Sequence, residues 1–485
     1  MQTPWNKLSH LNQNEFRALQ NAKLRAFVRH QLMFSPYYRK LFTKHNLSRS
    51  DIQTTDDLVK IPFTTKEDLA PRADERTRPR QFILQPDEHL IKQYFPKSKL
   101  FRLAARKIAK KDVKAELEWE YKPVHLHFTT GRSALPTPFA YSSYDLEQLK
   151  ESGKRLLDVS GISHDSVAIN GFPYSPHLAF WLTYYAMTTI RMLGLHSGGG
   201  KIMGTEKIID AIQNMKASVV VFIPGYCYHL LRRAVELKKD FSSVKHVIFG
   251  GERVSPGLRD KVKELLGKLG AHEVEILATY AMTEGKTAWI QCGEQTGYHL
   301  YPDMEFFEVI DENGQRVKEG GPGELVYTAL DWRGSVVIRY RTGDRTHGID
   351  YGACPNCGRT VPRILPDLQR ATEVREFHLT KVKGEFINLN NFYPVLSGIR
   401  ELEEWQIEIG KRNNDPYEVD ELRLFVALKN PADFDRFVPI VQKKVEEAVN
   451  VSVKVEQLPL GELLERLGME TELKEKRILD ARPKA

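Results

Sequence analysis

Cysteine, long apolar runs and clustered charge are all scarce in this chain of 485 residues. Its four cysteines are too few for a disulfide scaffold at this length, which favours a reducing compartment. The longest apolar stretches, such as ASVVVFIPGY at 217–226, are long enough for a strand but far too short to cross a bilayer. The opening MQTPWNKLSHLNQNEF has neither the basic head nor the apolar core of a secretory signal. We therefore expect a cytoplasmic protein with no membrane partner.

The net charge of +8 is spread along the chain rather than gathered in a basic tail. Lysine and arginine alternate with acids in segments such as ELKKD, KVKEL and ELKEKR, as on solvated helix faces. A nucleic-acid interface would need clustered cations or interleaved aromatic residues, so no nucleic-acid partner is expected. A pocket for anionic ligands could use a small part of the excess charge.

The length exceeds what a single core usually supports, so at least two domains are expected. Residues 145–340 alternate strand-like and helix-like segments, which predicts a parallel sheet flanked by helices. From about 304 to 345 the pattern changes to hairpin-like strands, with ENGQ as a turn. A shorter α+β segment follows. We predict an α/β fold with a large N-terminal domain, 1–369, and a small C-terminal domain, 370–485.

A polar, glycine-bearing stretch, TTGRSALPT, begins at residue 129, directly after the strand-like VHLHF. A strand-to-helix turn with hydroxyls and exposed backbone N–H groups is suited to gripping phosphate. It lacks the Gly-Lys-Ser/Thr ending of the common phosphate loop, so a polar surface turn is the alternative. The candidate phosphate ligands here are Thr129, Thr130, Gly131, Arg132 and Ser133.

Three further stretches follow predicted strands: IFGGER at 248–253, YAMTEG at 280–285 and YRTGD at 340–344. In α/β sheets the strand ends that border one crevice are where ligands collect. Together these stretches predict one ligand site built from distant parts of the chain.

The chain resembles the adenylate-forming ligases, specifically the phenylacetate–CoA ligase branch, over nearly its whole length. The resemblance rests on the stretches LRAFVRHQLMFSPYYRKLF, IPFTTKEDL, TTGRSALPT, SGGG at 197–200, PGYCYHLL at 224–231, YAMTEG and RYRTGD. It implies a large adenylation domain with parallel helix-flanked sheets and a distorted β-barrel part. It also implies a small, mobile α+β C-terminal domain.

The reaction implied by the resemblance is attack of a carboxylic acid on the α-phosphorus of ATP, followed by thioester formation with coenzyme A. ATP, Mg²⁺ and coenzyme A are thus the expected small-molecule partners, and a homodimer is possible. Phe172, Tyr174 and Tyr280 could form flat pocket walls, which favours an aryl or arylalkyl acid. Ordinary core packing is the alternative for these aromatics.

The resemblance also implies roles for individual residues. Glu284 would bind magnesium, and Asp344 would accept hydrogen bonds from the ribose hydroxyls. Tyr280 would lie against adenine, with the segment around Gly251, Glu252 and Arg253 on its other side. Thr283 would contact phosphate, and Arg370 would belong to the hinge. Lys474 would be the catalytic lysine, with Lys476 as the neighbouring candidate.

The sequence departs from the family pattern at two places. Ala134 and Leu135 stand in the phosphate loop where glycine and a polar residue are common, and Ala371 and Thr372 replace two hinge acids. Two alternatives therefore stay open. One is an adenylating enzyme that passes the acyl or nucleotidyl group to another acceptor. The other is a relative that binds nucleotide without turnover.

The pair Cys354 and Cys357 has the C-x-x-C spacing of a zinc knuckle, which supplies half of a tetrahedral site. Cys292 and His299 are the best remaining ligands, and the resembled branch commonly has a cysteine and a histidine there. We expect a closed, structural zinc site, with His347 as a spare ligand and free thiols as the alternative. Cys227, between two tyrosines, is expected to be buried packing.

Overall fold

The computed structural model describes residues 4–72, 74–129, 136–252, 254, 256–366, 368–370, 379–382, 385–388, 392–411, 420–449, 451–468 and 475–482. The chain divides into two compact units. Unit 1 comprises Met1–Ser166, Tyr174–Gly194 and Leu277–Leu368, and unit 2 comprises Val167–Pro173, Leu195–Ile276 and Gln369–Ala485. The predicted division at 369/370 stays a prediction.

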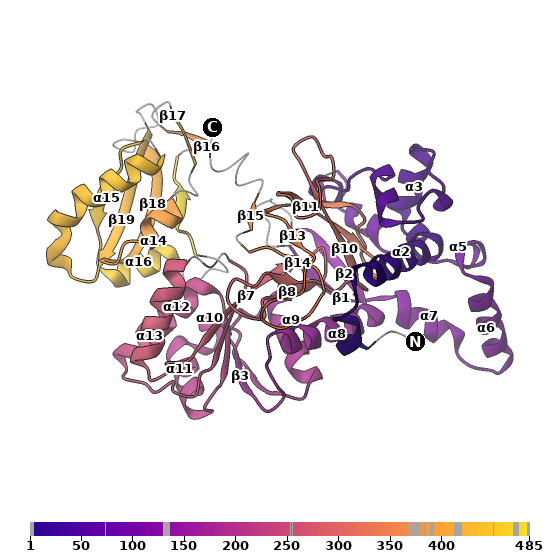
Figure 1. The fold of residues 1–485 in the computed structure, drawn as a ribbon, viewed down its shortest axis with the longest axis horizontal. Helices are drawn as coiled ribbons and strands as arrows, with labels where there is room; N and C mark the ends of the chain where they lie inside the picture. The colour runs from indigo at the N-terminus through magenta and orange to yellow at the C-terminus, as the bar shows by residue number, and fades with distance from the viewer. Residues whose placement is uncertain are drawn as a thin grey trace. The chain divides into compact units, whose positions relative to one another are not determined.

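Unit 1 opens with a series of helices (Figure 1). Several of them begin at a residue whose side chain caps the first turn. Asn12 and Glu15 form a reciprocal capping box, and Thr65 pairs in the same way with Asp68 within the stretch TTKED. The helices of this part are α1 (Trp5–Leu8), α2 (Gln13–His30), α3 (Pro36–Lys44), α4 (Lys66–Leu69), α5 (Glu88–Tyr94), α6 (Lys97–Ile108) and α7 (Val113–Tyr121).

The rest of unit 1 is built from antiparallel strands and two long helices, α8 (Ser143–Val159) and α9 (Leu178–Thr189). Strands β10, β11 and β12 pair in sequence order, and short strands β13, β14 and β9 form a second small sheet. The strands are β1 (Pro123–Phe128), β2 (Pro138–Ser142), β7 (Glu275–Met282, entering from unit 2), β8 (Thr287–Ile290), β9 (Tyr298–His299), β10 (Glu305–Ile310), β11 (Gly323–Ala329), β12 (Tyr340–Thr346), β13 (Ile349–Asp350) and β14 (Arg363–Ile364). A distorted barrel stays a prediction.

Unit 2 contains the predicted parallel, helix-flanked strands. Strand β5 (Val219–Phe222) pairs in parallel with β3 (Val167–Asn170) and β6 (His246–Phe249). All four residues of β5 are buried, as expected for a central strand. The helices of this part are α10 (Gly200–Met203), α11 (Thr205–Asn214), α12 (Pro224–Glu236) and α13 (Pro256–Lys268), and β4 (Leu193–His196) enters from unit 1. The α/β fold class is confirmed.

The C-terminal segments of unit 2 form an α+β layer around a long antiparallel pair, β18 (Leu402–Lys411) and β19 (Asp420–Leu428). Strand β20 (Lys454–Gln457) extends this sheet in parallel to β19, and β21 (Ile478–Asp480) in parallel to β18. The remaining elements are α14 (Phe392–Ser397), α15 (Phe434–Val449), α16 (Leu460–Leu467), β15 (Gln369–Arg370), β16 (Leu379–Val382) and β17 (Glu385–Asn388).

Two local expectations were wrong. The stretch at 129–137 connects two antiparallel strands, β1 and β2, instead of a strand and a helix, because PFAYS forms a strand before α8 begins at Ser143. The stretch YRTGD lies inside β12 instead of after a strand. The register of β12 shifts between the partners Glu324 and Val326 of β11, so the motif bulges out of the ladder.

Among the described residues, no helix is both long and apolar enough to cross a bilayer.

A buried carboxyl group, Glu305, lies in the core of unit 1. Its Oε1 accepts hydrogen bonds from Trp289 Nε1 at 2.8 Å and from the backbone N–H of Tyr301 at 2.6 Å. Burial raises the pKa of Glu305 from 4.5 to about 8. The folded state therefore holds a proton that the unfolded chain loses near pH 4.5.

We predict that the stability contribution of protonated Glu305 is fully present below pH 4.5 and is lost as the pH rises through about 8. At roughly 1.4 kcal/mol per pKa unit, the effect amounts to a few kcal/mol. Glu305→Gln, which stays neutral, should flatten this dependence in urea unfolding measured between about pH 5 and pH 9. The exposed Glu312→Gln is the matched control. An unchanged pH dependence in Glu305→Gln would contradict the assignment.

Candidate active site and metal centre

The YAMTEG stretch ends β7 and turns into β8 over residues 283–286. The backbone N–H of Gly285 donates to Met282 O at 3.1 Å, and Lys286 adopts a left-handed φ of 59°. Lys286 is fully buried and donates to Asp145 at 2.8 Å. Breaking such a pair would leave an uncompensated buried charge, so it fixes the turn that carries Glu284.

The RTGD bulge of β12 is shaped by its own side chains. Thr342 Oγ1 donates to Leu325 O at 2.8 Å and accepts from the backbone N–H of Asp344 at 3.0 Å. Gly343 has φ +73°, a conformation that glycine adopts without strain. The Arg341 side chain pairs with Glu324 on the neighbouring strand. The bulge therefore presents Asp344 on a short, internally bonded segment.

Two tyrosine–carboxylate hydrogen bonds join these motifs. Tyr280 Oη donates to Asp344 Oδ2 at 2.8 Å, and Tyr340 Oη donates to Glu284 Oε1 at 3.0 Å. Each motif thus supplies one tyrosine and one carboxylate to the other. Burial and the neighbouring Asp344 raise the pKa of Tyr280 well above its usual value, and burial and Glu284 do the same for Tyr340. Both hydroxyls therefore remain donors near neutral pH.

The four groups form one cluster, because the charges of Glu284 and Asp344 both contribute to raising the pKa of each tyrosine. Both tyrosines are buried, whereas both carboxylates are partly exposed. A carboxylate is an acceptor-only group, suited to vicinal hydroxyls and to a hard cation. The cluster can therefore present two oriented carboxylates to a polar ligand.

The Tyr280 ring, expected to lie against adenine, is stacked on Trp289 with the ring centroids 5.4 Å apart and an interplanar angle of 29°. Trp289 therefore covers part of this ring. A role toward adenine stays a prediction.

The ends of the predicted phosphate loop are held together at the base of the β1–β2 hairpin. The backbone N–H of Thr129 donates to Thr137 O at 3.0 Å, and that of Thr137 donates to Thr129 Oγ1 at 3.3 Å. Thr130, Gly131, Arg132 and Ser133 lie outside the described residues. On β2 the Tyr141 ring lies 4.9 Å from Lys286 Nζ, so the hairpin contacts the turn that carries Glu284.

Other predicted site residues belong to unit 2. Gly251 follows β6 with φ +87°, and Glu252 comes next. Arg370 lies in β15, but its side chain is outside the described part, as are Arg253 and Lys474. Lys476 is exposed, and its backbone N–H donates to Leu467 O at 2.9 Å. Phe172 is buried in unit 2, whereas Tyr174 belongs to unit 1. Their predicted roles stay predictions.

The partners of the two carboxylates do not follow from either motif alone, and the position of Tyr340 directly before RTGD is the only sequence signal that points to it. A histidine pair beside the loop is a further feature that the motifs do not predict, in which His125 Nε2 lies 2.9 Å from His127 Nε2. Burial, followed by the charge of His125, lowers the pKa of His127 to about 3, so His127 is neutral at physiological pH.

The chain is similar to known proteins in sequence and in fold. The family model described as "AMP-binding enzyme" matches residues 148–329. The chain belongs to the AMP-binding superfamily of adenylate-forming enzymes. Two curated relatives are phenylacetate–coenzyme A ligases. That of Thermus thermophilus is 25% identical over 98% of this chain and 99% of its own length. That of Aromatoleum evansii is 24% identical over 98% and 96%.

Solved structures show the same fold. A crystal structure of 2-hydroxyisobutyryl-CoA ligase in the postadenylation state matches with a TM-score of 0.76 and 20% identity, covering 99% of this chain and 94% of that one. The same ligase, with 2-HIB-AMP and CoA in the thioesterification state, matches over the same shares with a TM-score of 0.62. The AMP-binding fold therefore extends over nearly the whole chain.

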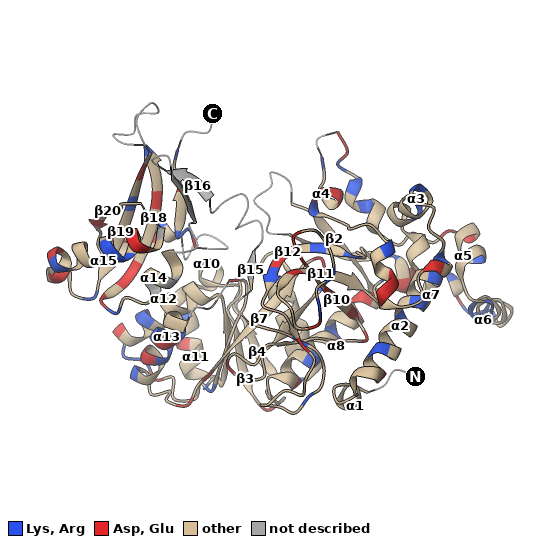
Figure 2. Cartoon of the chain, turned by 45° about the horizontal axis from the view of Figure 1, so that its top comes forward, with Lys and Arg blue, Asp and Glu red and all other residues tan. Residues whose placement is uncertain are grey.

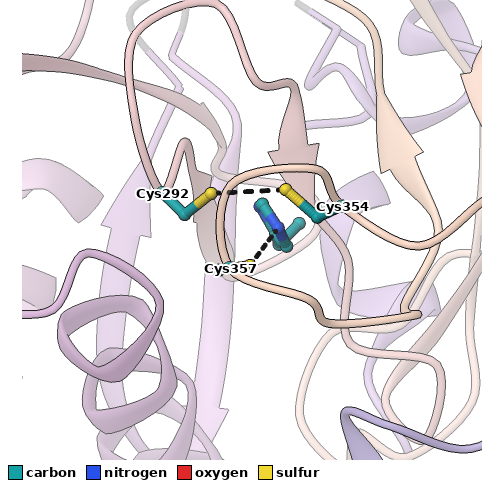
Figure 3. Close-up of side chains that lie close together, drawn as sticks. Cys292, Cys354 and Cys357 are labelled. Carbon is teal, nitrogen blue, oxygen red and sulfur yellow. Dashed lines mark hydrogen bonds between the residues drawn. The ribbon is translucent and has the colours of Figure 1, made fainter.

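Unit 1 of this AMP-binding protein also contains the predicted cysteine–histidine cluster (Figure 3). The ligand atoms of Cys292, His299, Cys354 and Cys357 all lie within 4.8 Å of one another. Cys292 Sγ is 3.4 Å from Cys354 Sγ, and Cys357 Sγ is 3.3 Å from His299 Nε2. Sulfur ligands of a tetrahedral zinc ion lie about 3.8 Å apart. The donor set fits zinc, whereas His347 is exposed and outside the cluster.

The surroundings orient the ligands. His299 Nδ1 lies 3.3 Å from Ile290 O, which favours the tautomer with a proton on Nδ1 and leaves Nε2 for a metal. The backbone N–H of Cys354 donates to Arg359 O at 2.8 Å, which closes the knuckle. Next to the knuckle, Thr360 Oγ1 donates to Leu11 O at 2.6 Å and so ties in the N-terminal segment.

We predict that the purified protein carries about one zinc per chain and that Cys354→Ser removes it. A closed site contributes its binding energy to folding, so the melting temperature should fall by about 5 °C or more. The buried Cys227→Ser, in unit 2, is the control and should keep the metal. Mass spectrometry for metals and calorimetry supply the two readouts. A wild-type protein without metal, or full zinc content in Cys354→Ser, would contradict the assignment.

Proposed function

We propose that this chain is an AMP-forming acid–CoA ligase of the phenylacetate–CoA ligase type. It activates a carboxylic acid with ATP to an acyl-adenylate and then forms a thioester with coenzyme A. The observation that carries the proposal is the cluster in which Tyr280 and Tyr340 hold Asp344 and Glu284. The curated relatives at about 25% identity, named phenylacetate–coenzyme A ligases, support it.

In the first step a carboxylate oxygen of the acid attacks the α-phosphorus of ATP. The bond from that phosphorus to the bridging oxygen breaks, and pyrophosphate leaves. Asp344, oriented by Tyr280, accepts hydrogen bonds from the ribose hydroxyls and so positions the nucleotide. The hydroxyls and N–H groups of the loop after Thr129, together with Thr283, contact the phosphates, and Arg132 adds positive charge.

The carboxylate of Glu284 fits magnesium, because it is a partly exposed hard oxygen ligand held in one orientation by Tyr340. Magnesium bound there would neutralise phosphate charge as the two anions approach each other. In the C-terminal segment we assign Lys474 to the α-phosphate, with Lys476 as the neighbouring candidate. Arg370 would belong to the hinge that allows this segment to move between the two half-reactions.

In the second step the thiolate sulfur of coenzyme A attacks the acyl carbon and displaces AMP. For the acid we propose an aryl or arylalkyl group packed against Tyr174 and Tyr280 of unit 1. In unit 1 the Tyr174 ring already contacts Phe180 and Trp181, with centroids 5.3 and 6.0 Å apart. Aromatic rings of this kind favour a flat ligand over a long flexible chain.

A second candidate acceptor is favoured by the hinge sequence. Ala371 and Thr372 stand where relatives of this type have acids, and the hinge serves the second half-reaction. An enzyme with the same first step could pass the acyl or nucleotidyl group to an amine, a carrier protein or another cofactor.

Pyrophosphate exchange into ATP, measured over a panel of carboxylic acids, tests the first step. We expect exchange with aryl or arylalkyl acids, and a loss of at least about 100-fold in Asp344→Ala because the ribose loses a charged partner. The exposed Asp165→Ala is the matched control and should keep full activity. Mass spectrometry after addition of coenzyme A then detects the thioester.

The outcomes separate the candidates. Exchange without a thioester would favour another acceptor. No exchange with any acid would favour a nucleotide-binding relative without turnover and would overturn the proposal.

A further inference from the structure

The apolar face of helix α6 (Lys97–Ile108) is exposed to solvent. Phe101 and Ile108 are 81% and 85% exposed, the highest values among the large apolar side chains of the described residues. Ala104 and Ala105 between them are exposed as well. The four residues have the spacing i, i+3, i+4 and i+7, which places them on one face of the helix. An apolar face normally packs against a core, and here it lies on the surface.

The inner side of α6 contacts α7 (Val113–Tyr121). Leu103 is buried, and Lys99 pairs with Glu120 of α7 at 2.7 Å. Arg102 and Arg106 both pair with Glu116, at 2.9 and 3.0 Å. Three ion pairs and one leucine thus hold the helix in place. The side chains of the outward apolar face are exposed, so they are not part of the core formed by the described residues of this unit.

Residues 97–111 contain seven lysines and arginines and no acid. Three of the seven are the paired residues of the inner side. The other four form no close ion pair within the described part of the chain, although Lys107 helps to lower the pKa of Glu88, and all four are exposed: Lys97, Lys107, Lys110 and Lys111. The apolar stripe is therefore accompanied by positive charge at both ends of the helix, from Lys97 at its first residue and from the other three lysines near its last. Figure 2 colours the Lys and Arg positions of the chain blue.

We propose that α6 is an interfacial helix that attaches this protein to an anionic lipid surface. A basic amphipathic helix lies in the plane of the headgroups with its apolar face buried in the acyl boundary. Twelve residues give a length of about 18 Å, enough for Phe101 and Ile108 to enter the interface together. The expectation of no membrane partner rested on the length of apolar runs, which bears only on membrane-spanning segments.

Charge decides between the possible occupants of this face. A second copy would bring the four unpaired lysines of each chain toward one another, which is repulsive at short range. Nucleic acid would attract the lysines. It would gain little from the apolar stripe, because bases stack on aromatic rings and Phe101 is the single aromatic residue of the stripe. An anionic bilayer satisfies both the apolar stripe and the charge.

The test is cosedimentation of the full-length protein with phosphatidylcholine vesicles that contain roughly one third phosphatidylserine. We expect binding that falls with rising salt, and much weaker binding to pure phosphatidylcholine. Phe101→Ser/Ile108→Ser should lower the partition coefficient at least about tenfold, and Lys110→Gln/Lys111→Gln several-fold. An unchanged unfolding midpoint shows that the variants remain folded.

The matched control lies on α15, where exposed Ile440 is followed by exposed Lys443 and Lys444. Ile440→Ser with Lys443→Gln/Lys444→Gln should leave vesicle binding unchanged, because that helix also carries acids. Three results would overturn the proposal. The first is no binding to the vesicles, and the second is binding by Phe101→Ser/Ile108→Ser that equals that of the wild type. The third is that vesicles do not bind while the protein forms a dimer, or a complex with duplex DNA, that the apolar or the lysine double variant abolishes.

Discussion

The candidate active site depends on one constraint, the pair of hydrogen bonds by which two buried tyrosines hold two partly exposed carboxylates. Tyr280 and Glu284 come from one motif, and Tyr340 and Asp344 from another, so neither motif orients its own carboxylate. A hydrogen bond to a charged acceptor is worth about 1.5–3 kcal/mol, and here it is made where burial removes competition from water. Glu284 and Asp344 are thereby oriented before any ligand arrives, which is what electrostatic preorganisation requires.

Buried ion pairs in unit 1 also fix local geometry. Lys286 and Asp145 pin the turn after β7, and Arg155 forms a two-pronged pair with Asp303. Replacing such pairs with apolar residues is often neutral, whereas removing one partner is costly, so they act mainly to specify geometry. The cysteine–histidine cluster closes the loop between β13 and β14, a region with few strands of its own. Unit 1 thus combines an apolar core with several buried polar links.

The alternation of buried strands and helices in unit 2 could be predicted, because the run around Val219–Phe222 is apolar and bounded by helical periods. The zinc ligands could be predicted from spacing and from the resemblance. The hairpin at 129–137 could not, since PFAYS is short and its pairing with β1 is a tertiary contact. The partners of Glu284 and Asp344 were missed for the same reason. Helices α5, α6 and α7 lie outside the segments assigned from the sequence, although the apolar stripe of α6 has the spacing of an amphipathic helix.

The central claim is that Tyr280 acts on nucleotide binding through Asp344. A double-mutant cycle on the dissociation constant for ATP, with Tyr280→Phe, Asp344→Asn and the combined variant, measures this coupling directly. We predict that Tyr280→Phe weakens ATP binding about tenfold in the wild-type background, the equivalent of one hydrogen bond to a charged group. In the Asp344→Asn background the same change should have little further effect. Additive losses in the combined variant would show that the tyrosine does not position the carboxylate, and would contradict the account.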